Sequence, residues 1–211
     1  MTGPPFEPFA AYVALGDSMS IDAYPGPGLG GPSLLHRNRD DVHPSFAGHD
    51  LVSLDPATTF VNLARDGATT HDVLRVLHEE PPRVEGPCLV SLTVGGNDLI
   101  GGTFRSDGQR PDEIARRIGR IVDEVRERLR PRVLLLATIY DPTDGVGDLW
   151  VPGQPPRRAL GALHALNAAI RDLAARTDDV VLAEVHDHFL GHGSHHDDAN
   201  NPHHDPRDPT C

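Results

Sequence analysis

The sequence predicts an α/β fold built on a parallel five-stranded sheet. Two features carry this prediction: five short aliphatic runs bounded by Gly, Pro and Asp, and amphipathic helical patterns lying between them. Runs of this kind are typical of strands buried on both faces. Because strands and helices alternate along the chain, we expect helices on both faces of the sheet.

The expected strands cover residues 12–15, 59–63, 88–94, 133–138 and 180–185. One helix is expected to open at Thr70. A clearer one opens at Pro111 and ends before Pro131, with apolar residues at three- and four-residue steps. A third carries its apolar stripe at Leu160, Leu163, Leu166, Ile170 and Leu173. Residues 24–56 and 191–211 show neither pattern, and the first of these is either a functional lid or partly ordered.

Composition narrows the class of protein. A chain of 211 residues fits a single domain, residues 1–211, with a tail rich in His, Asp and Pro from about residue 191. The net charge of −12 argues against nucleic acid and anionic membrane surfaces as partners. Residues 1–11 lack the basic and apolar regions of a signal peptide, so a cytoplasmic location is expected. The 2 cysteines form neither a disulfide framework nor a zinc pattern.

Small and polar residues follow the first three strands. Ser18 lies after the first strand, Gly67 after the second and Asn97 after the third. In parallel sheets these ends face one crevice. Acyl transfer needs a nucleophile and donors for the oxyanion, which a serine at a turn, a glycine backbone and an amide side chain can supply. Each residue alone is typical of a turn or a helix cap, so the prediction rests on the three together.

Three segments resemble the conserved blocks of the SGNH (GDSL-type) hydrolases: residues 12–18 ending in Gly-Asp-Ser, residues 62–69 around Gly67, and Gly-Gly-Asn-Asp at residues 95–98. The resemblance covers residues 12 to 193. It implies a three-layer α/β/α, flavodoxin-like sandwich and no metal or organic cofactor. It also implies that Ser18 is the nucleophile and the first oxyanion donor, with Gly67 and Asn97 as the other two donors.

The general base departs from the family pattern. The family closes with Asp-x-x-His-Pro-Asn and a final helix, but no Asp in this tail has His three residues later. Either the sequence is truncated before that block and its closing helix, or the base comes from elsewhere. The Phe-Leu-Gly-His-Gly segment at residues 189–193 resembles a segment of related hydrolases. We therefore take His192 as the first candidate, with the other tail histidines as alternatives.

Other polar patterns have simpler explanations. Residues 26–31 match Gly-x-Gly-x-x-Gly, but the motif does not follow a strand directly and its prolines remove N–H donors. We expect a loop at the rim of the site. Asp98 either orients a histidine or caps a helix, while Asp141 and Asp144 are expected to cap a turn, with a substrate contact as the alternative. The His- and Asp-rich tail could hold zinc or nickel, although a solvated tail is favoured.

The resulting hypothesis is a hydrolase that cleaves small-molecule carboxylic esters through a serine acyl-enzyme. The first alternative is a binding module of the same fold that lacks a working base, and the second is metal binding through the tail. With 1 Trp and 3 Tyr, aromatic platforms for sugars are sparse, which disfavours a polysaccharide substrate.

Overall fold

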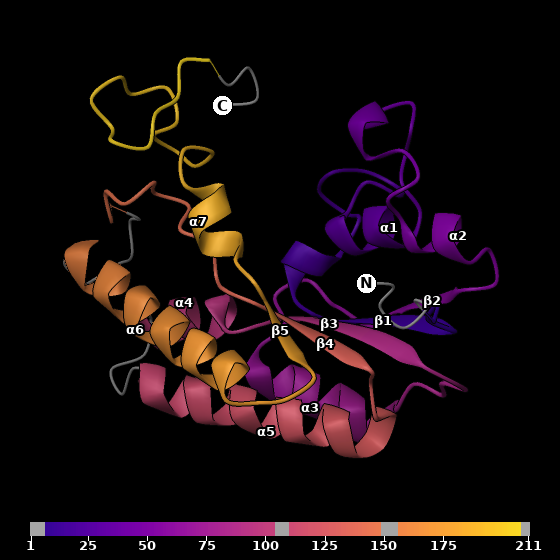
Figure 1. The fold of residues 1–211 in the computed structure, drawn as a ribbon. Helices are drawn as coiled ribbons and strands as arrows, with labels where there is room; N and C mark the ends of the chain where they lie inside the picture. The colour runs from indigo at the N-terminus through magenta and orange to yellow at the C-terminus, as the bar shows by residue number, and fades with distance from the viewer. Residues whose placement is uncertain (1–6, 104–109, 149–155, 208–211) are drawn as a thin grey trace, which may run out of the picture. The chain divides into compact units, whose positions relative to one another are not determined.

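The computed structural model describes residues 7–103, 110–148 and 156–207. Its centre is a five-stranded parallel sheet in the order β2-β1-β3-β4-β5 (Figure 1), which confirms the predicted sheet. The strands are β1 (Ala11–Gly16), β2 (Thr59–Asn62), β3 (Cys88–Thr93), β4 (Val133–Ala137) and β5 (Val180–Ala183). Tyr12 of β1 pairs in register with Phe60 of β2 and Leu89 of β3.

Three helices agree with the sequence patterns: α3 (Thr70–Glu79), α5 (Pro111–Leu129) and α6 (Pro156–Ala175). The patterns missed the shorter helices α1 (Gly31–His36), α2 (Leu51–Leu54), α4 (Gly96–Thr103) and α7 (Val185–Phe189), and the 3-10 turns η1 (Ser18–Ser20) and η2 (Pro44–Phe46). Residues 24–56 are therefore partly ordered. The predicted fifth strand was two residues too long, because residue 185 begins α7. No helix within the described ranges is long and apolar enough to cross a bilayer.

The chain divides into two compact units, Met1–Thr93 with Ile121–Leu135, and Val94–Arg120 with Leu136–Cys211. In the first unit, alternate residues of β1 face opposite sides of the sheet. Tyr12 and Ala14 lie in a core with Leu51 of α2, and Leu35 of α1 packs against it. Leu15 faces α3 instead, beside Val73 and Val76. Within this unit the sheet is thus covered on both faces, as Figure 1 shows for α1 and α2 on one side and α3 on the other.

The start of α3 is fixed by a capping box. The Thr69 hydroxyl accepts a hydrogen bond from the Asp72 amide, and the Asp72 carboxylate accepts one from the Thr69 amide at 3.0 Å. The pKa of Asp72 lies below its ordinary value, first because of its bond with the Thr69 hydroxyl and then because of the Thr69 amide. This helix therefore begins at a defined residue, directly after the loop that contains Gly67.

In the second unit, α6 packs against β5 and is tied to the end of β4. The Asn167 side chain accepts a hydrogen bond from the Ile139 amide and donates one to the Ile139 carbonyl, both at 2.8 Å. Arg171 of α6 makes two hydrogen bonds to the Glu184 carboxylate, at 2.7 and 2.8 Å. These contacts fix the ends of β4 and β5, from which the loops of this unit's candidate site emerge.

Candidate functional site

Ser18 follows β1 at a turn that only glycine permits. Gly16 has a φ of +138°, and a Cβ built on it would lie 2.1 Å from the Thr93 carbonyl oxygen. This close approach lets the Asp17 amide donate to that same oxygen at 3.0 Å. The turn is thereby held against the end of β3, and Ser18 begins η1 directly beyond it.

A buried polar network supports the Ser18 turn from below. The Asp17 carboxylate, 6% exposed, caps η1 by accepting from the Met19 amide at 3.1 Å. It also accepts from the Thr93 hydroxyl at 3.3 Å, and that hydroxyl is 2.8 Å from the Ser20 hydroxyl. Ser18 itself is half-exposed, and neither its hydroxyl nor its amide hydrogen-bonds to another described residue. Both groups are therefore available to a ligand while the turn around them is fixed.

Gly67 lies in an exposed turn after β2. Its φ is +69°, while a Cβ built on it would meet no atom within 4 Å, so conformation rather than space favours glycine here. The Ala68 amide closes the turn by donating to the Arg65 carbonyl at 3.1 Å. The Gly67 amide donates to no acceptor among the described residues. The Gly67 amide thus resembles the Ser18 amide, which also donates to no described acceptor.

The first unit brings the segments of Ser18 and Gly67 side by side. The Arg65 amide donates to the Gly16 carbonyl at 3.0 Å. The Asn62 side chain donates to the Ser20 carbonyl at 2.7 Å. Two bonds thus connect the turn after β1 to the loop after β2. The sequence comparison placed Asn62 in the second block without assigning this contact.

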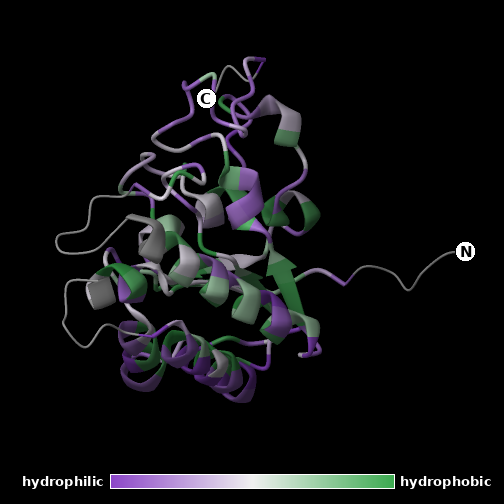
Figure 2. Ribbon diagram, turned by 90° about the vertical axis from the view of Figure 1, so that its left-hand side faces the viewer, coloured by the Kyte–Doolittle hydropathy of each residue, from purple (hydrophilic) through white to green (hydrophobic). Residues whose placement is uncertain are grey.

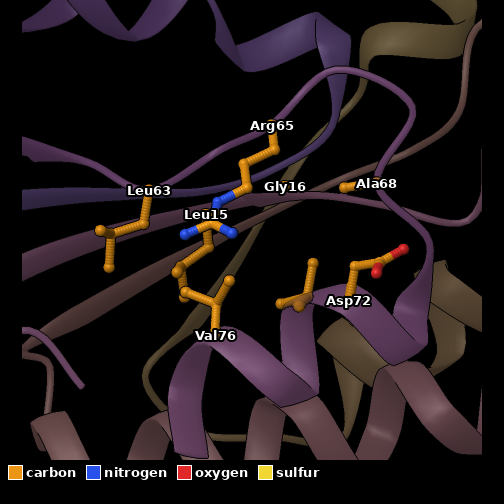
Figure 3. A pocket seen from close by; sticks show the side chains of 8 residues that line it. Leu15, Gly16, Leu63, Arg65, Ala68, Asp72 and Val76 are labelled. Carbon is orange, nitrogen blue, oxygen red and sulfur yellow. The ribbon is translucent and has the colours of Figure 1, made fainter. Parts of the chain in front are cut away.

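A cavity of about 10 Å³ lies beneath these two loops, between β1 and α3 (Figure 3). In Figure 3 the side chains of Leu15, Arg65 and Val76 converge on it. This volume accommodates about one water molecule, so the cavity cannot hold an ester substrate. It is a packing gap under the site.

Asn97 belongs to the second unit, in the first turn of α4. Gly95, just before the helix, has a φ of +120°, and a Cβ there would lie 3.0 Å from Ile139. The fully buried Asp98 forms an ion pair with Arg117 of α5, at 3.3 Å. Asn97 is half-buried beside this anchored residue. The ion pair with Arg117 is a role that the sequence did not predict for Asp98.

His192 also belongs to the second unit and is exposed. It lies three residues beyond the end of α7, where its amide donates to the Phe189 carbonyl at 2.9 Å. Its ring stands edge-on to that of Phe189, with centroids 6.4 Å apart, and Phe189 in turn packs on Tyr140 at 4.6 Å. The aromatic contacts orient the segment that carries His192.

The loop after β4 is organised by two buried carboxylates, as the turn-cap prediction required. Asp141 accepts from the Thr143 amide and hydroxyl and from the Gly145 amide, at 2.7–2.9 Å. Asp144 instead contacts a segment distant in sequence, because it accepts backbone hydrogen bonds from Gly191, Gly193 and His195. The tail is therefore irregular and mostly hydrophilic, purple near its end in Figure 2, yet fixed by hydrogen bonds. Residues 208–211 of the predicted tail lie outside the described residues.

Four of the other tail histidines have structural partners. His195 Nε2 lies 2.8 Å from the Asp148 carboxylate, and His186 Nδ1 lies 2.9 Å from that of Asp187. The rings of His196 and His204 hydrogen-bond to backbone carbonyls. In the part of the chain that the structure describes, no three His, Cys, Asp or Glu side chains gather in a group that could hold a metal ion. The geometry of these residues thus offers no support for metal binding through the tail.

The glycine-rich segment at residues 26–31 surrounds the Asp22 carboxylate. Asp22 accepts from the amides of Gly28 and Gly30, at 3.0 and 2.8 Å, and from the Ser33 hydroxyl at 3.0 Å. Desolvation opposes ionisation, but these bonds outweigh it and hold the Asp22 pKa below its ordinary value. Because its own carboxylate occupies the amides, the segment is not built to bind a phosphate.

Comparison with known proteins identifies the family. The family model for the GDSL-like lipase/acylhydrolase family matches residues 14–204. Among solved structures, one described as a GDSL-like lipase from Parabacteroides merdae is similar at a TM-score of 0.61 and 12% identity, covering 87% of this chain and 80% of that one.

Two other structures share the fold. An α/β hydrolase from the metagenome of Lake Arreo, Spain, has a TM-score of 0.61 at 18% identity, covering 95% of this chain and 89% of that one. A variant of an acetyl xylan esterase from Geobacillus stearothermophilus has a TM-score of 0.58 at 17% identity, covering 85% and 78%. No curated protein matches the chain. The chain belongs to the GDSL-like lipase/acylhydrolase family and is an enzyme that hydrolyses ester bonds.

Proposed function

We propose that the chain hydrolyses small-molecule carboxylic esters through a covalent acyl-enzyme on Ser18. The observation that carries this proposal is the Ser18 turn. Its hydroxyl and amide have no hydrogen-bond partner among the described residues, while Asp17, Thr93 and Ser20 hold the surrounding backbone. A hydroxyl that is open to substrate on a fixed turn suits a serine nucleophile, which a neighbouring base must activate in the reacting complex.

The oxyanion donors in this proposal are the Ser18 amide, the Gly67 amide and the Asn97 side chain. The two amides support it because they donate to no described acceptor and their segments are joined by hydrogen bonds from Arg65 and Asn62. Such donors act only if they are already aimed at the developing charge. The assignment of Asn97 rests on its place after β3 and on the family resemblance.

His192 is proposed as the general base. It accepts the Ser18 proton as Oγ attacks the ester carbonyl, and the three donors stabilise the resulting oxyanion. Collapse of this intermediate breaks the C–O bond to the leaving group, and the alcohol departs with the proton from His192. Water then attacks the acyl-enzyme, again giving its proton to His192; the bond between the acyl carbon and Ser18 Oγ breaks, Oγ takes the proton back from His192, and the carboxylic acid is released. Ser18 is regenerated, so no cofactor is consumed.

Acetyl esters are the first substrates to test, because one structurally similar protein is an acetyl xylan esterase. The scarcity of Trp and Tyr still favours small esters over an acetylated polysaccharide. The cytoplasmic location and the absence of nucleic-acid or membrane partners remain predictions from the sequence.

Hydrolysis of p-nitrophenyl acetate, together with labelling by a fluorophosphonate, tests the proposal. We expect wild type to turn over and to be labelled once, at Ser18. Ser18→Ala should lose the label and lower kcat by about 10³-fold or more. Ser53→Ala is the matched control, because this exposed serine of α2 only donates its hydroxyl to the capping Asp50, and its loss should leave both readouts unchanged.

Equal hydrolysis by wild type and Ser18→Ala, with no label on either, would refute the Ser18 mechanism. A wild type that binds the ester without turnover would instead support the alternative of a binding module without a working base.

A further inference from the structure

The Asp144 carboxylate lies buried beneath the segment that contains His192, with 1% of the residue exposed. Its Oδ1 accepts from the amides of Gly191 and Gly193, at 3.0 and 2.8 Å, and its Oδ2 accepts from the His195 amide at 3.0 Å. The three donors flank His192 on both sides. One side chain thus determines where the backbone on either side of His192 lies.

These bonds explain why a carboxylate is present at this position. Burial of a charged group is costly unless hydrogen bonds replace its hydration, and three amides do so here. Hydrogen bonds to an ionised acceptor are also shorter and stronger than neutral ones. Successive N–H groups that converge on one anion form a concave nest, which the protein fills with its own side chain.

The glycines on either side of His192 are required by close packing. Gly191 has a φ of +94°, and a Cβ there would lie 2.5 Å from the His203 carbonyl oxygen. A Cβ on Gly193 would lie 2.6 Å from the Pro142 carbonyl oxygen and 2.7 Å from Asp144 Oδ1. The Gly-His-Gly pattern is therefore the sequence signature of a backbone that wraps closely around Asp144.

Asp144 is itself fixed before it meets this segment. Its backbone has a positive φ of +49°, inside the loop that the Asp141 carboxylate closes through the Gly145 amide. The Asn201 side chain donates to the Asp144 carbonyl at 3.1 Å, and the Ser194 amide donates to that of Pro142 at 2.9 Å. These bonds, together with those from the Asp144 carboxylate to residues 191–195, are called the clamp; they join the loop after β4 to the segment that contains His192.

We infer that Asp144 is a positioning residue for the reaction: its carboxylate holds the backbone of residues 191–195 so that His192 is presented in one place. This inference rests on the proposed role of His192. It accounts for how this chain can fix its base although Phe189, not Asp, stands three residues before it. The ring contact with Phe189 and the hydrogen bonds to Asp144 both constrain where the His192 segment lies.

Asp144→Asn tests this inference. The amide retains one acceptor oxygen but directs an NH₂ group at an N–H donor, so at least one of the three bonds is lost. We expect kcat for p-nitrophenyl acetate to fall by about 10- to 100-fold, because a displacement of about 1 Å costs this much in catalysis. KM should stay within about twofold, since the clamp orders the base rather than the substrate.

The double variant Asp144→Asn with His192→Ala separates positioning from general stability. If Asp144 acts through His192, the double variant should be no slower than His192→Ala alone, because residues acting as a unit are not additive. Asp50→Asn is the matched control. This carboxylate is also buried, 6% exposed, and also accepts from a backbone amide, that of Ser53, but it caps α2 in the other unit. It should leave kcat unchanged.

Gly193→Ala provides a second route that keeps the charge. Its Cβ would push the segment off Pro142 and Asp144, so the same loss of kcat with unchanged KM is expected. Hydrogen exchange of the Gly191, Gly193 and His195 amides supplies a readout besides activity. Exchange at these three sites should accelerate in Asp144→Asn while the amides of β1 remain protected.

The outcomes distinguish this inference from the proposed function. If Asp144→Asn has the same kcat and the same amide exchange as wild type while His192→Ala is inactive, the positioning role of Asp144 is wrong and the proposed function is unaffected. Full activity of His192→Ala, with Ser18→Ala inactive, would overturn both the base assignment and the clamp's catalytic role, while Ser18 chemistry stands. Losses in Asp144→Asn and His192→Ala that multiply in the double variant would show that Asp144 acts independently of His192.

Discussion

Near Ser18, the position with the least space for a side chain is Gly16, so Gly16→Ala is the most informative substitution. The φ of +138° costs a residue with a Cβ about 1–3 kcal/mol. The new Cβ would also lie 2.1 Å from the Thr93 carbonyl oxygen, so the backbone must move and the bond from the Asp17 amide is lost. That bond contributes about 1 kcal/mol. We expect the free energy of unfolding to fall by about 2–4 kcal/mol.

Urea unfolding followed by circular dichroism measures this loss, and Gly48→Ala separates its two causes. Gly48 also has a positive φ, +78°, but a Cβ there would meet no atom within 4 Å. Its substitution should therefore cost only about 1 kcal/mol, for the conformation alone. If the losses of unfolding free energy in Gly16→Ala and Gly48→Ala agree within about 0.5 kcal/mol, the contact with Thr93 does not constrain the turn. Slower fluorophosphonate labelling of folded Gly16→Ala would show that the displaced turn carries Ser18.

Three further predictions concern stability. Thr69→Ala removes one half of the capping box and should lower the free energy of unfolding by about 0.5–2 kcal/mol in urea; no change would contradict the box. Leu77→Ala, at a fully buried site, should cost about 2–5 kcal/mol by thermal or urea unfolding, against less than about 0.5 kcal/mol for the exposed Leu54→Ala. Below about pH 4 the fold should weaken, because the folded-state pKa values of Asp22, Asp50 and Asp72 are lowered and the unfolded chain binds more protons there. Urea titrations from pH 6 to 3 should show the free energy of unfolding falling with pH, and this fall should be smaller in Asp72→Asn. An equal fall in that variant would contradict the contribution assigned to Asp72.

The sheet was predictable from sequence because its strands are buried on both faces and therefore form continuous apolar runs. Cys88 to Thr93 is one such run, and its strand differs from the prediction by a single residue. The long helices were predictable for the same reason, since α5 and α6 present apolar stripes to a core. In both cases burial left a pattern in the sequence, a continuous apolar run for a strand or a periodic stripe for a helix.

The short helices left no such period. α1 contains Gly31 and Pro32, and α2 has four residues, so neither shows an amphipathic repeat. They form because of tertiary contacts: Leu35 and Leu51 pack with Tyr12 on the face of the sheet. Isolated helices of this length are unstable in water, so their presence depends on packing that the local sequence does not encode.

The residues of the candidate site show the same contrast between local sequence signals and contacts between distant residues. Ser18 and Gly67 were predicted as site residues because a turn at a strand end requires particular residue types, and those types are visible in the sequence. The roles of Asn62, Thr93 and Asp144 were missed, because each acts through a contact to a residue at least 42 positions away. The one signal that pointed to Asp144 was the pair of glycines around His192, which indicated a tightly packed backbone without saying what it packs against.

Both units use the same physical device to order loops that lack regular structure. In the first, Asp22 gathers the amides of Gly28 and Gly30; in the second, Asp144 gathers those of Gly191 and Gly193. Glycine suits both loops because amides two residues apart can face one carboxylate only if the backbone between them curls tightly, and two of these four glycines, Gly28 and Gly191, have a positive φ. A carboxylate held in this way ties together more backbone than a hydroxyl could, since its two oxygens can accept about four hydrogen bonds. Two of the acidic residues that give this chain a charge of −12 therefore have a structural role. Replacing Asp22 and Asp144 to reduce that charge would break the hydrogen bonds that order the two loops.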